Sequence, residues 1–373
     1  MLLANQKQRG GKSVLIGMSG GVDSSIAAYL LKQHGYYTEG LSFLLWGRGN
    51  SGGNDNHDNR NTTETTNTCC CAASLNDAGA TAAALGIKHG IADVRLEFMQ
   101  RVIEPFIESY GRGMTPNPCV LCNQHVKFPY LLAEANSRGF DYIATGHYAV
   151  ATDQQELMTA TDMTKDQSYF LYVLSLDMLS RIKFPLGRWT KPQVRELAAE
   201  LDLPCHKRPE SQDICFVDNA GYRAFINVYS GDIRAAGPIV DVDGKTIGTH
   251  RGLFAYTVGQ RRGIGIAARQ PLYVIDIDTA NNTLIVGPKD VGLKTQFTVD
   301  AINWLVPATE VPDNILVKFR SAMAAVPANI EGISGSAAKN VVLHTPQWAP
   351  ARGQSAVFYV GNRVIGGGII VLV

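Results

Sequence analysis

The chain has 373 residues, which is enough for two or three domains of ordinary size. Hydrophobic residues make up 45% of it and charged residues 18%, which excludes a largely disordered protein. The formal net charge is +1, so bulk charge gives no support for a polyanionic partner, and any nucleic-acid surface has to be a local patch.

No targeting segment stands out. Residues 1–12 are polar and lack the apolar centre of a secretory signal peptide. No run approaches the roughly 18 apolar residues that a membrane span needs. The seven cysteines are an odd number in a long chain, which argues against a disulfide scaffold. We therefore expect a cytoplasmic protein with no membrane partner, and we ask whether any cysteine is reactive or binds metal.

Strand and helix signals alternate in the first half of the chain. Short apolar runs predict strands at 13–18, 40–46 and 142–145. Periodic apolar residues predict helices at 24–34, 74–85, 126–137 and 190–201. Two of these helix starts have the spacing of a capping box, Ser74 with Asp77 and Thr190 with Gln193. Strands that alternate with helices indicate a parallel sheet wrapped by helices.

Residues 47–68 interrupt this alternation. They are rich in Asn and Gly and nearly lack apolar side chains. Such a segment cannot bury enough surface to offset the entropy of ordering it, so we expect a mobile polar insertion.

The second half of the chain is rich in strand and turn signals. After about residue 216 the helix signal fades, and a hairpin is expected over 238–253 with its turn at Asp243–Gly244. Further strands are expected at 272–277, 283–286 and from Phe297 onward. We predict three domains: an α/β domain at 1–220, a small β-rich central domain at 221–290 and a C-terminal β-barrel at 291–373.

The sharpest motif follows the first predicted strand and reads Gly-Met-Ser-Gly-Gly-Val-Asp-Ser-Ser over residues 17–25. Paired glycines let the backbone approach a phosphate and turn its N–H groups inward. Serine hydroxyls add donors, and the helix that follows directs its positive end at the anion. Asp23 cannot bind an anion, so its predicted role is to hold Mg²⁺ on the phosphates.

The loop does not end in Gly-Lys-Ser/Thr, so it is not the P-loop of ordinary NTPases. It resembles the pyrophosphate loop of enzymes that split ATP into AMP and pyrophosphate. On this loop alone, the group that is activated could be a carboxylate, an amide or a nucleobase.

A Cys-x-x-Cys pair, Cys119 and Cys122, follows Pro116-Asn117-Pro118 and precedes the predicted helix 126–137. We expect the prolines to prevent helix formation before the pair. Cys122 would then lie close to a helix N-terminus, where the pKa of a thiol is lowered. A third thiol, Cys215, stands where the α/β half meets the β-rich half.

These three thiols are compatible with simple packing, with a metal or iron–sulfur site, or with sulfur transfer through a persulfide. Sulfur transfer explains more of the chain, because ATP makes an oxygen into a leaving group that sulfur displaces. An iron–sulfur cluster stays open as a cofactor but is not our prediction. For the remaining cysteines, Cys69, Cys70, Cys71 and Cys205, we expect incidental packing.

With these motifs in hand, the chain closely resembles the tRNA-specific 2-thiouridylase family (MnmA type). The resemblance is a series of motifs spread over most of the chain. They are Gly17–Ser25, Thr115–Pro118, Leu121–Asn123, Ala144–Tyr148, Lys165–Leu171, Lys191–Arg195, Ile214–Phe216, Thr257–Arg261 and Gly353–Tyr359.

The resemblance implies a PP-loop ATP-pyrophosphatase domain of the adenine nucleotide alpha hydrolase type, followed by the small β-rich domain and the barrel. It implies a tRNA-uridine 2-sulfurtransferase that adenylates the C2 oxygen of the wobble uridine and replaces it with sulfur. ATP with Mg²⁺ would be the cosubstrate and tRNA the partner, with a sulfur-relay protein or cysteine desulfurase as sulfur donor.

Residue roles follow from the same resemblance. Cys215 matches the persulfide carrier and Cys122 the catalytic nucleophile, which can form a transient disulfide with it. The positions that match the ATP site are Gly17, Met18, Ser19, Gly20, Gly21, Val22, Asp23, Ser24, Phe43 and Gly146. The positions that match tRNA contacts are Asn117, Pro118, Cys119, His147, Lys165, Asp166, Gln167, Arg320 and Gln354. Cys119 stands where other members have Asp.

Two other classes of protein remain as alternatives. An amide-forming synthetase could use the same ATP loop, but it would need a site for an amino donor and would leave Cys122 and Cys215 without a role. A non-enzymatic RNA-binding module with a cysteine-bound metal would leave the phosphate loop idle.

Overall fold

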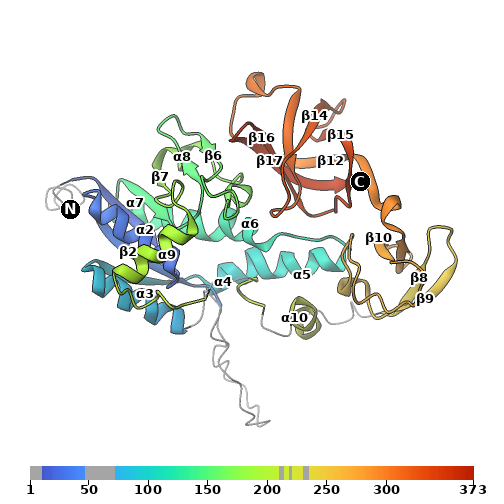
Figure 1. Ribbon diagram of the computed structural model, residues 1–373, viewed down its shortest axis with the longest axis horizontal. Coiled ribbons are helices and arrows are strands. Elements are labelled where there is room, and N and C mark those ends of the chain that lie inside the picture. The colour runs from blue at the N-terminus through green and yellow to red at the C-terminus, as the bar shows by residue number, and fades with distance from the viewer. Residues whose placement is uncertain (1–10, 47–71, 210–213, 218–220, 230–234) are drawn as a thin grey trace, which may run out of the picture. The chain divides into compact units, whose positions relative to one another are not determined.

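The computed structural model describes residues 11–46, 72–209, 214–217, 221–229 and 235–373 (Figure 1). The chain divides into two compact units, each built from three segments. The first unit comprises Met1–Arg101, Cys122–Ser168 and Leu176–Gly221, and the second comprises Val102–Leu121, Tyr169–Ser175 and Tyr222–Val373. The predicted insertion at 47–68 and the triplet Cys69–Cys71 lie outside the described residues.

The first unit is built on a five-stranded sheet with the strand order β3-β2-β1-β4-β7. All of its neighbouring strands are parallel, which confirms the predicted parallel α/β sheet. Its strands are β1 (Ser13–Gly17), β2 (Tyr37–Leu44), β3 (Lys88–Asp93), β4 (Tyr142–Thr145) and β7 (Ile182–Lys183). The central strand β1 is inaccessible to solvent over Val14–Ile16, as expected for a parallel strand covered on both faces.

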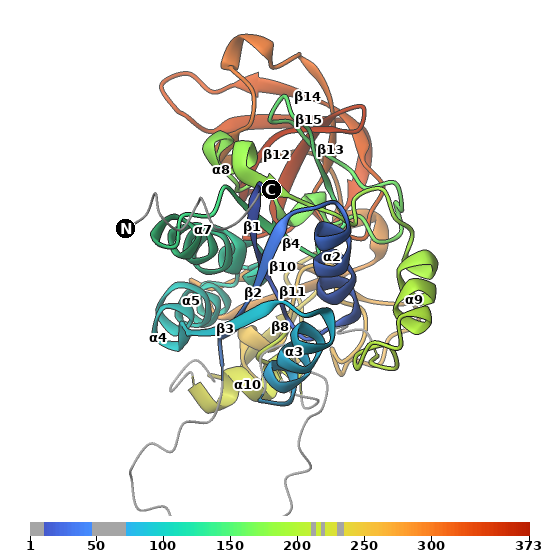
Figure 2. The same cartoon turned by 90° about the vertical axis from the view of Figure 1, so that its left-hand side faces the viewer.

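Helices cover the two faces of this sheet. Figure 2 shows α2 (Val22–Gln33) and α3 (Ala72–Leu85) on one side of the strands and α7 (Phe128–Ser137) on the other. Helix α9 (Lys191–Glu200) packs against α2. The shorter elements are α4 (Arg95–Phe98), α8 (Leu176–Arg181) and the antiparallel pair β5 (Val150–Ala151) and β6 (Leu157–Met158).

One of the two predicted capping boxes is confirmed and the other is wrong. Thr190 and Gln193 cap the start of α9 reciprocally. Ser74, by contrast, is the third residue of α3, and its hydroxyl accepts a hydrogen bond from Arg208 Nη2 at 2.6 Å. Ser74 and Asp77 therefore both bind Arg208 and do not cap the helix.

The helix around the Cys-x-x-Cys pair begins earlier than predicted. Helix α6 (Pro118–Cys122) starts at the second proline, a π-helical turn (Asn123–Lys127) follows, and α7 continues from there. Proline is well tolerated in the first turn of a helix because its missing N–H would have no intrahelical partner. The expectation that the prolines prevent helix formation is wrong, and Cys122 ends the first helical segment.

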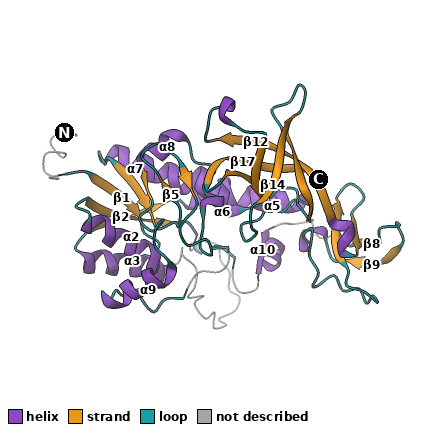
Figure 3. Cartoon of the chain, turned by 45° about the horizontal axis from the view of Figure 1, so that its top comes forward, coloured by secondary structure: helices purple, strands orange, loops and turns teal. Residues whose placement is uncertain are grey.

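The second unit contains two β structures, which confirms the predicted β-rich region and barrel (Figure 3). A four-stranded sheet has the order β10-β11-β8-β9, from β8 (Gly237–Val240), β9 (Thr246–His250), β10 (Tyr273–Asp278) and β11 (Thr283–Gly287). A six-stranded barrel closes through the pairing of its first and last strands. Its strands are β12 (Leu293–Trp304), β13 (Asn314–Lys318), β14 (Val326–Gly332), β15 (Lys339–Trp348), β16 (Ser355–Val360) and β17 (Arg363–Leu372).

Short helical elements complete the described chain. They are α5 (Glu104–Gly111), the π-helical turn Met99–Ile103, α10 (Gly221–Tyr229) and the 3-10 turns Ser168–Phe170, Leu253–Ala255, Lys289–Gly292 and Ala308–Glu310. Helix α10 corrects the expectation that helices end near residue 216. Its sequence is amphipathic but only nine residues long, so its apolar spacing is easily confused with that of strands.

Candidate functional site

The loop between β1 and α2 turns the chain sharply at the carboxyl end of the central strand. Ser19 N donates to Ser24 Oγ at 3.1 Å, and Ser24 Oγ donates to Gly21 O at 3.1 Å. Ser25 Oγ also donates to Gly21 O, at 2.9 Å. No side chain caps α2 at Gly21, and the N–H groups in the first turn of a helix have no intrahelical partner, which makes this helix start a candidate anion site.

Two glycines let neighbouring backbone segments approach this loop. Gly20 has φ +74°, and a Cβ there would lie 2.1 Å from the carbonyl oxygen of Ser74. A Cβ on Gly146 would lie 2.8 Å from Asp23 C and Ser24 N. The structure therefore brings Gly146, at the end of β4, directly against the start of α2, and neither glycine can be replaced without moving backbone.

Asp23 is held by two side chains from distant segments. Lys191 Nζ lies 2.7 Å from Asp23 Oδ1 and 2.8 Å from Oδ2, and Tyr148 Oη donates to Oδ1 at 2.8 Å. The backbone N–H of Lys191 donates to Asp162 Oδ2 at 3.0 Å. This arrangement fixes the carboxylate beside the loop and places a nearly buried ammonium there.

The contacts of Asp23 bear on its predicted role toward Mg²⁺. A carboxylate offers about four lone-pair sites, and Lys191 and Tyr148 occupy three of them. A divalent cation on the same oxygens would lie next to the Lys191 ammonium, which repels it. Asp23 as arranged here does not fit a magnesium ligand.

Phe43 lies in β2, the neighbour of β1, and its side chain is 9% exposed. The adjacent Ser42 Oγ donates to Met18 O at 2.7 Å and lies 2.8 Å from His89 Nε2. This contact ties the loop to β2. Burial lowers the pKa of His89.

Arg208 also contacts the loop, although no sequence motif pointed to it. Its Nη1 donates to Asp77 Oδ2 at 2.7 Å and to Gly20 O at 3.3 Å, and its Nη2 donates to Ser74 Oγ. Lys191 and Tyr148 were missed as partners of Asp23, although both stand within motifs that carry the family resemblance. Their pairing depends on tertiary structure that no local pattern encodes.

The described cysteines differ in exposure. Cys119 is exposed in the first turn of α6, whereas Cys122 is 7% exposed. Cys215 is half-buried in a short turn over 214–217, where the adjacent Phe216 ring packs against Phe98 with 5.7 Å between centroids. Cys205 is buried with its Sγ 3.2 Å from Ser25 Oγ, as expected for a packed cysteine.

The predicted tRNA-contacting residues of the first unit make well-defined contacts. His147 packs between Phe128 and Phe184, and its Nδ1 lies 2.7 Å from Thr145 Oγ1. Burial, and next the ammonium of Lys127, lowers the pKa of His147 well below its ordinary value. The neutral imidazole is therefore the dominant form.

Residues 165–167 form a loop next to Tyr148. Gln167 Oε1 accepts from Tyr148 N at 2.9 Å, and Gln167 N donates to Tyr148 O at 2.8 Å. Asp166 accepts from Ala160 N and from Ser168 N and Oγ. Lys165 is half-buried. Through Tyr148, this loop is joined to Asp23.

In the second unit, three predicted tRNA contacts also have structural partners. Asn117 Oδ1 accepts from Val120 N at 3.4 Å, which is the contact of a cap at the start of α6, followed by the buried Pro118. Gln354 Nε2 donates to Thr115 O at 2.9 Å. Arg320 Nη2 donates to Ala349 O at 2.7 Å. Burial lowers the pKa of Arg320 below its ordinary value.

The described part of the chain shows neither a metal-binding cluster nor a membrane-spanning helix. No group of three or more His, Cys, Asp and Glu side chains there is arranged to hold a metal ion. No helix among those residues combines the length and the apolar character that crossing a membrane requires.

Three family models match successive parts of the chain. The model described as "tRNA methyl transferase HUP domain" matches residues 12–219, and "tRNA methyl transferase PRC-barrel domain" matches 223–288. "Aminomethyltransferase beta-barrel domain" matches 294–370. Together they follow the α/β sheet, the four-stranded sheet and the closed barrel in order.

Curated relatives align over nearly the whole chain. A protein of Magnetococcus marinus is 41% identical over 364 residues, and one of Chloroflexus aggregans is 43% identical over 363 residues. A protein of Chloroflexus aurantiacus is 42% identical over 363 residues. Each alignment covers 96% of this chain and 98% of the relative, and each relative is named tRNA-specific 2-thiouridylase MnmA. The chain therefore belongs to the MnmA family of tRNA-specific 2-thiouridylases.

Proposed function

We propose that the chain is a tRNA-uridine 2-sulfurtransferase, which replaces the C2 oxygen of the wobble uridine with sulfur at the expense of ATP. The observation that carries the proposal is the 41–43% identity to relatives named tRNA-specific 2-thiouridylase across 96% of the chain. The methyl transfer in the titles of two family models is not the activity that we propose.

The activation step uses the loop between β1 and α2. Its glycines and the first-turn N–H groups of α2 would bind the phosphates of ATP, with Phe43 and Gly146 at the nucleotide. The uridine O2 attacks the α-phosphorus, and the bond to pyrophosphate breaks. The products are pyrophosphate and an O2-adenylated uridine, in which AMP is the leaving group. Mg²⁺, when present, would neutralise phosphate charge.

Asp23 and Lys191 would act in this step as a fixed charge pair beside the phosphates. Lys191 supplies a cation that the loop itself lacks, and Asp23 holds that ammonium in place. Tyr148 orients the carboxylate through its hydroxyl. The Lys191 ammonium would stabilise the negative charge of pyrophosphate as it separates from the nucleotide.

The sulfur step would use two thiols. Cys215 receives a sulfur atom from a sulfur-relay protein or a cysteine desulfurase and becomes a persulfide. The terminal sulfur attacks C2 of the activated uridine, a carbon–sulfur bond forms, and AMP leaves. The Cys122 thiolate then attacks the Cys215 sulfur, which releases 2-thiouridine and leaves a Cys122–Cys215 disulfide. An external dithiol reductant returns both cysteines to thiols.

Exposure supports this division of roles. Cys215 is half-buried and so keeps part of its surface accessible to a donor, whereas Cys122 is nearly buried, as suits a thiol that acts on one partner. The exposed Cys119 occupies the first turn of α6, the same short helix that ends at Cys122. Cys119 is therefore the thiol that could substitute for Cys122, and its variant belongs in every cysteine experiment.

The test is an ATP–pyrophosphate exchange assay with and without tRNA. The proposal expects exchange that depends on tRNA and is not increased by ammonia or glutamine. An amide-forming synthetase would need an amino donor, and an RNA-binding module would show no exchange at all. If the products were ADP and phosphate, the assignment of the loop between β1 and α2 as a pyrophosphate-binding loop would be wrong.

A further inference from the structure

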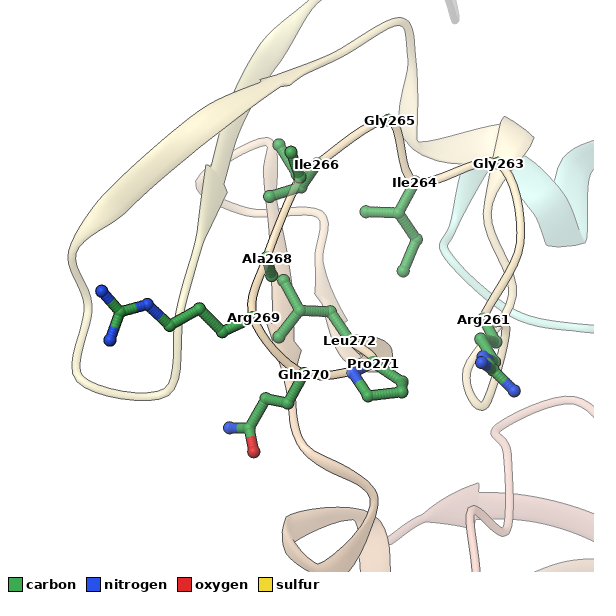
Figure 4. Close-up of a pocket in the computed structure, with 11 residues that line it drawn as sticks. Arg261, Gly263, Ile264, Gly265, Ile266, Ala268, Arg269, Gln270, Pro271 and Leu272 are labelled. Carbon is green, nitrogen blue, oxygen red and sulfur yellow. The ribbon is translucent and has the colours of Figure 1, made fainter.

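A surface loop of the second unit, residues 261–272, borders an open hollow of about 690 Å³. Figure 4 shows Arg261 and Arg269 on opposite sides of this hollow, with Ile264 and Ile266 along the loop between them. Nothing in the proposed activation or sulfur-transfer steps uses this loop.

The sequence around the loop has basic side chains but no acidic ones. Residues 244–275 contain no Asp or Glu, although the whole chain has 33 such residues and a net charge of only +1. The basic side chains of the stretch are Lys245, Arg251, Arg261, Arg262 and Arg269, and all are exposed. None of the described carboxylates forms an ion pair with them. Three of these unpaired cations, Arg261, Arg262 and Arg269, lie on the loop itself, and such a cluster is the electrostatic footprint of a polyanion site.

The loop is held in a defined shape. Gln260 Oε1 accepts from Thr257 N at 3.2 Å, and Gln260 Nε2 donates to Arg262 O at 2.9 Å. Ile264 is 6% exposed and belongs to the same apolar core as Val274 of β10. Arginines on a fixed backbone lose less conformational entropy when they bind a ligand.

A further guanidinium reaches the loop from α10. The atom nearest to a Cβ built on Gly263 would be Arg223 Nη1, at 3.4 Å. The Nε of Arg223 is buried and has no hydrogen-bond partner among the described residues. Because this Nε is shielded from solvent, a phosphate beside the loop would meet Arg223 through its Nη atoms, of which Nη1 is the one that approaches Gly263.

We propose that the loop 261–272 and Arg223 form a binding surface for the phosphate backbone of tRNA. The inference rests on the proposed function, which supplies RNA as the partner, and it adds a contact surface to that function. The planar fork of arginine matches phosphate oxygens in pairs. Phosphate contacts position an RNA without reading its bases, so the surface should bind cognate and non-cognate tRNA alike.

The experiment measures tRNA affinity by fluorescence anisotropy across a series of salt concentrations. The test variant is Arg261→Gln/Arg262→Gln. The matched control is Arg95→Gln/Arg112→Gln, which removes two exposed arginines that each pair with a carboxylate, at 2.6 Å and 3.6 Å. Arg261→Lys/Arg262→Lys keeps the charge and tests for a purely structural role of the side chains.

A plot of log affinity against log salt has a negative slope. We expect the magnitude of this slope to decrease by about one for each lost arginine that contacts a phosphate, hence by about two in the test variant. The control and the lysine variant should keep the unsubstituted slope. Affinity for cognate and non-cognate tRNA should fall by the same factor. At saturating tRNA the rate of 2-thiouridine formation should be unchanged, because only KM for tRNA rises.

Two results would overturn the inference. The first is an unchanged salt slope in the test variant while the unsubstituted chain binds and thiolates tRNA, which leaves the proposed function intact. The second is normal tRNA binding with sulfur delivery lost only when a donor protein supplies the sulfur, which would assign the surface to an acidic protein. If the unsubstituted chain bound neither cognate nor non-cognate tRNA, the proposed function itself would be refuted.

Discussion

The Lys191 ammonium spans both oxygens of the Asp23 carboxylate, at 2.7 Å and 2.8 Å. The two residues are 168 positions apart, and the Lys191 side chain is only 9% exposed. P-loop NTPases carry their lysine inside the phosphate loop, whereas this loop has none. The cation reaches the loop from the first turn of α9.

A double-mutant cycle with Lys191→Met and Asp23→Asn tests this pair. Either substitution alone leaves the other charge without its partner, whereas the double variant removes both charges. We expect the coupling in the free energy of unfolding to be about 1 kcal/mol, because Asp23 is partly exposed and the pair is screened. Urea unfolding of the four proteins measures it. Strictly additive effects would show that the pair contributes nothing to folding.

Gly20 of the phosphate loop should be harder to replace than Gly35, which also has a positive φ but has no close neighbour. Gly20 has φ +74° and would place a Cβ 2.1 Å from Ser74 O, whereas Gly35 has φ +80° and no heavy atom within 4 Å of its Cβ. Gly35→Ala should therefore cost only about 1 kcal/mol of backbone strain. Gly20→Ala should also weaken ATP binding by about tenfold or more, which is 1.4 kcal/mol.

Calorimetric titration with a non-hydrolysable ATP analogue compares these two glycine variants. Equal affinities in Gly20→Ala and Gly35→Ala would show that the close approach to Ser74 does not shape the nucleotide site.

Substitution of the proposed catalytic cysteines should abolish sulfur transfer but leave ATP cleavage intact. Cys215→Ser and Cys122→Ser should each lower 2-thiouridine formation to roughly a hundredth or less, because one removes the persulfide carrier and the other the thiol that releases the product. Both variants should retain tRNA-dependent pyrophosphate release. Cys119→Ser should keep most of the activity, since neither of the two proposed sulfur steps uses that thiol.

Assays of tRNA thiolation and pyrophosphate release on the same preparations measure both steps. Full activity in Cys122→Ser together with loss in Cys119→Ser would transfer the nucleophile's role to the exposed thiol. Loss of activity and of bound iron in all three variants would favour an iron–sulfur cluster.

The stability of the protein should fall in mild acid partly because of His147. Its pKa in the folded protein lies well below the ordinary value of 6.5, so the unfolded chain binds the proton more tightly. The stability due to this histidine is present above about pH 6.5 and is lost as the pH falls below it. The lowered pKa of His89 acts in the same direction.

Unfolding by urea between pH 5 and pH 8, roughly the range over which histidine titrates, tests this prediction. His147→Gln should flatten the decline without removing it, because His89 remains. His344→Gln, which changes an exposed histidine on β15, is the matched control. A decline of equal steepness in the His147 variant would contradict the assignment.

Much of the fold could be predicted from the sequence because its signals are local. The apolar run of β1 and the Thr190 capping box need no tertiary information, and both agree with the structure. Strand β3 (Lys88–Asp93) went unpredicted because its sequence, Lys-His-Gly-Ile-Ala-Asp, lacks both an apolar run and regular alternation. Its place at the edge of the sheet explains why so polar a strand is tolerated.

The candidate site could be predicted only in part. The phosphate loop has a recognisable pattern because the residues that we propose to bind the anion are consecutive in the sequence. The partners of Asp23 and Gly20, which are Lys191, Tyr148 and Arg208, come from other segments, and only the folded chain brings them together. The position of Cys122 was misjudged because Pro118 opens a helix instead of preventing one.

The most direct test of the proposed function is mass spectrometry of the nucleosides and of the ribonuclease fragments of unmodified tRNA after incubation with the protein, ATP, a persulfide source and a dithiol reductant. The account predicts 2-thiouridine at the wobble position, formed only when ATP is present and accompanied by AMP and pyrophosphate. Unaltered uridine under these conditions, or a methylated uridine formed when S-adenosylmethionine is supplied instead, would contradict it.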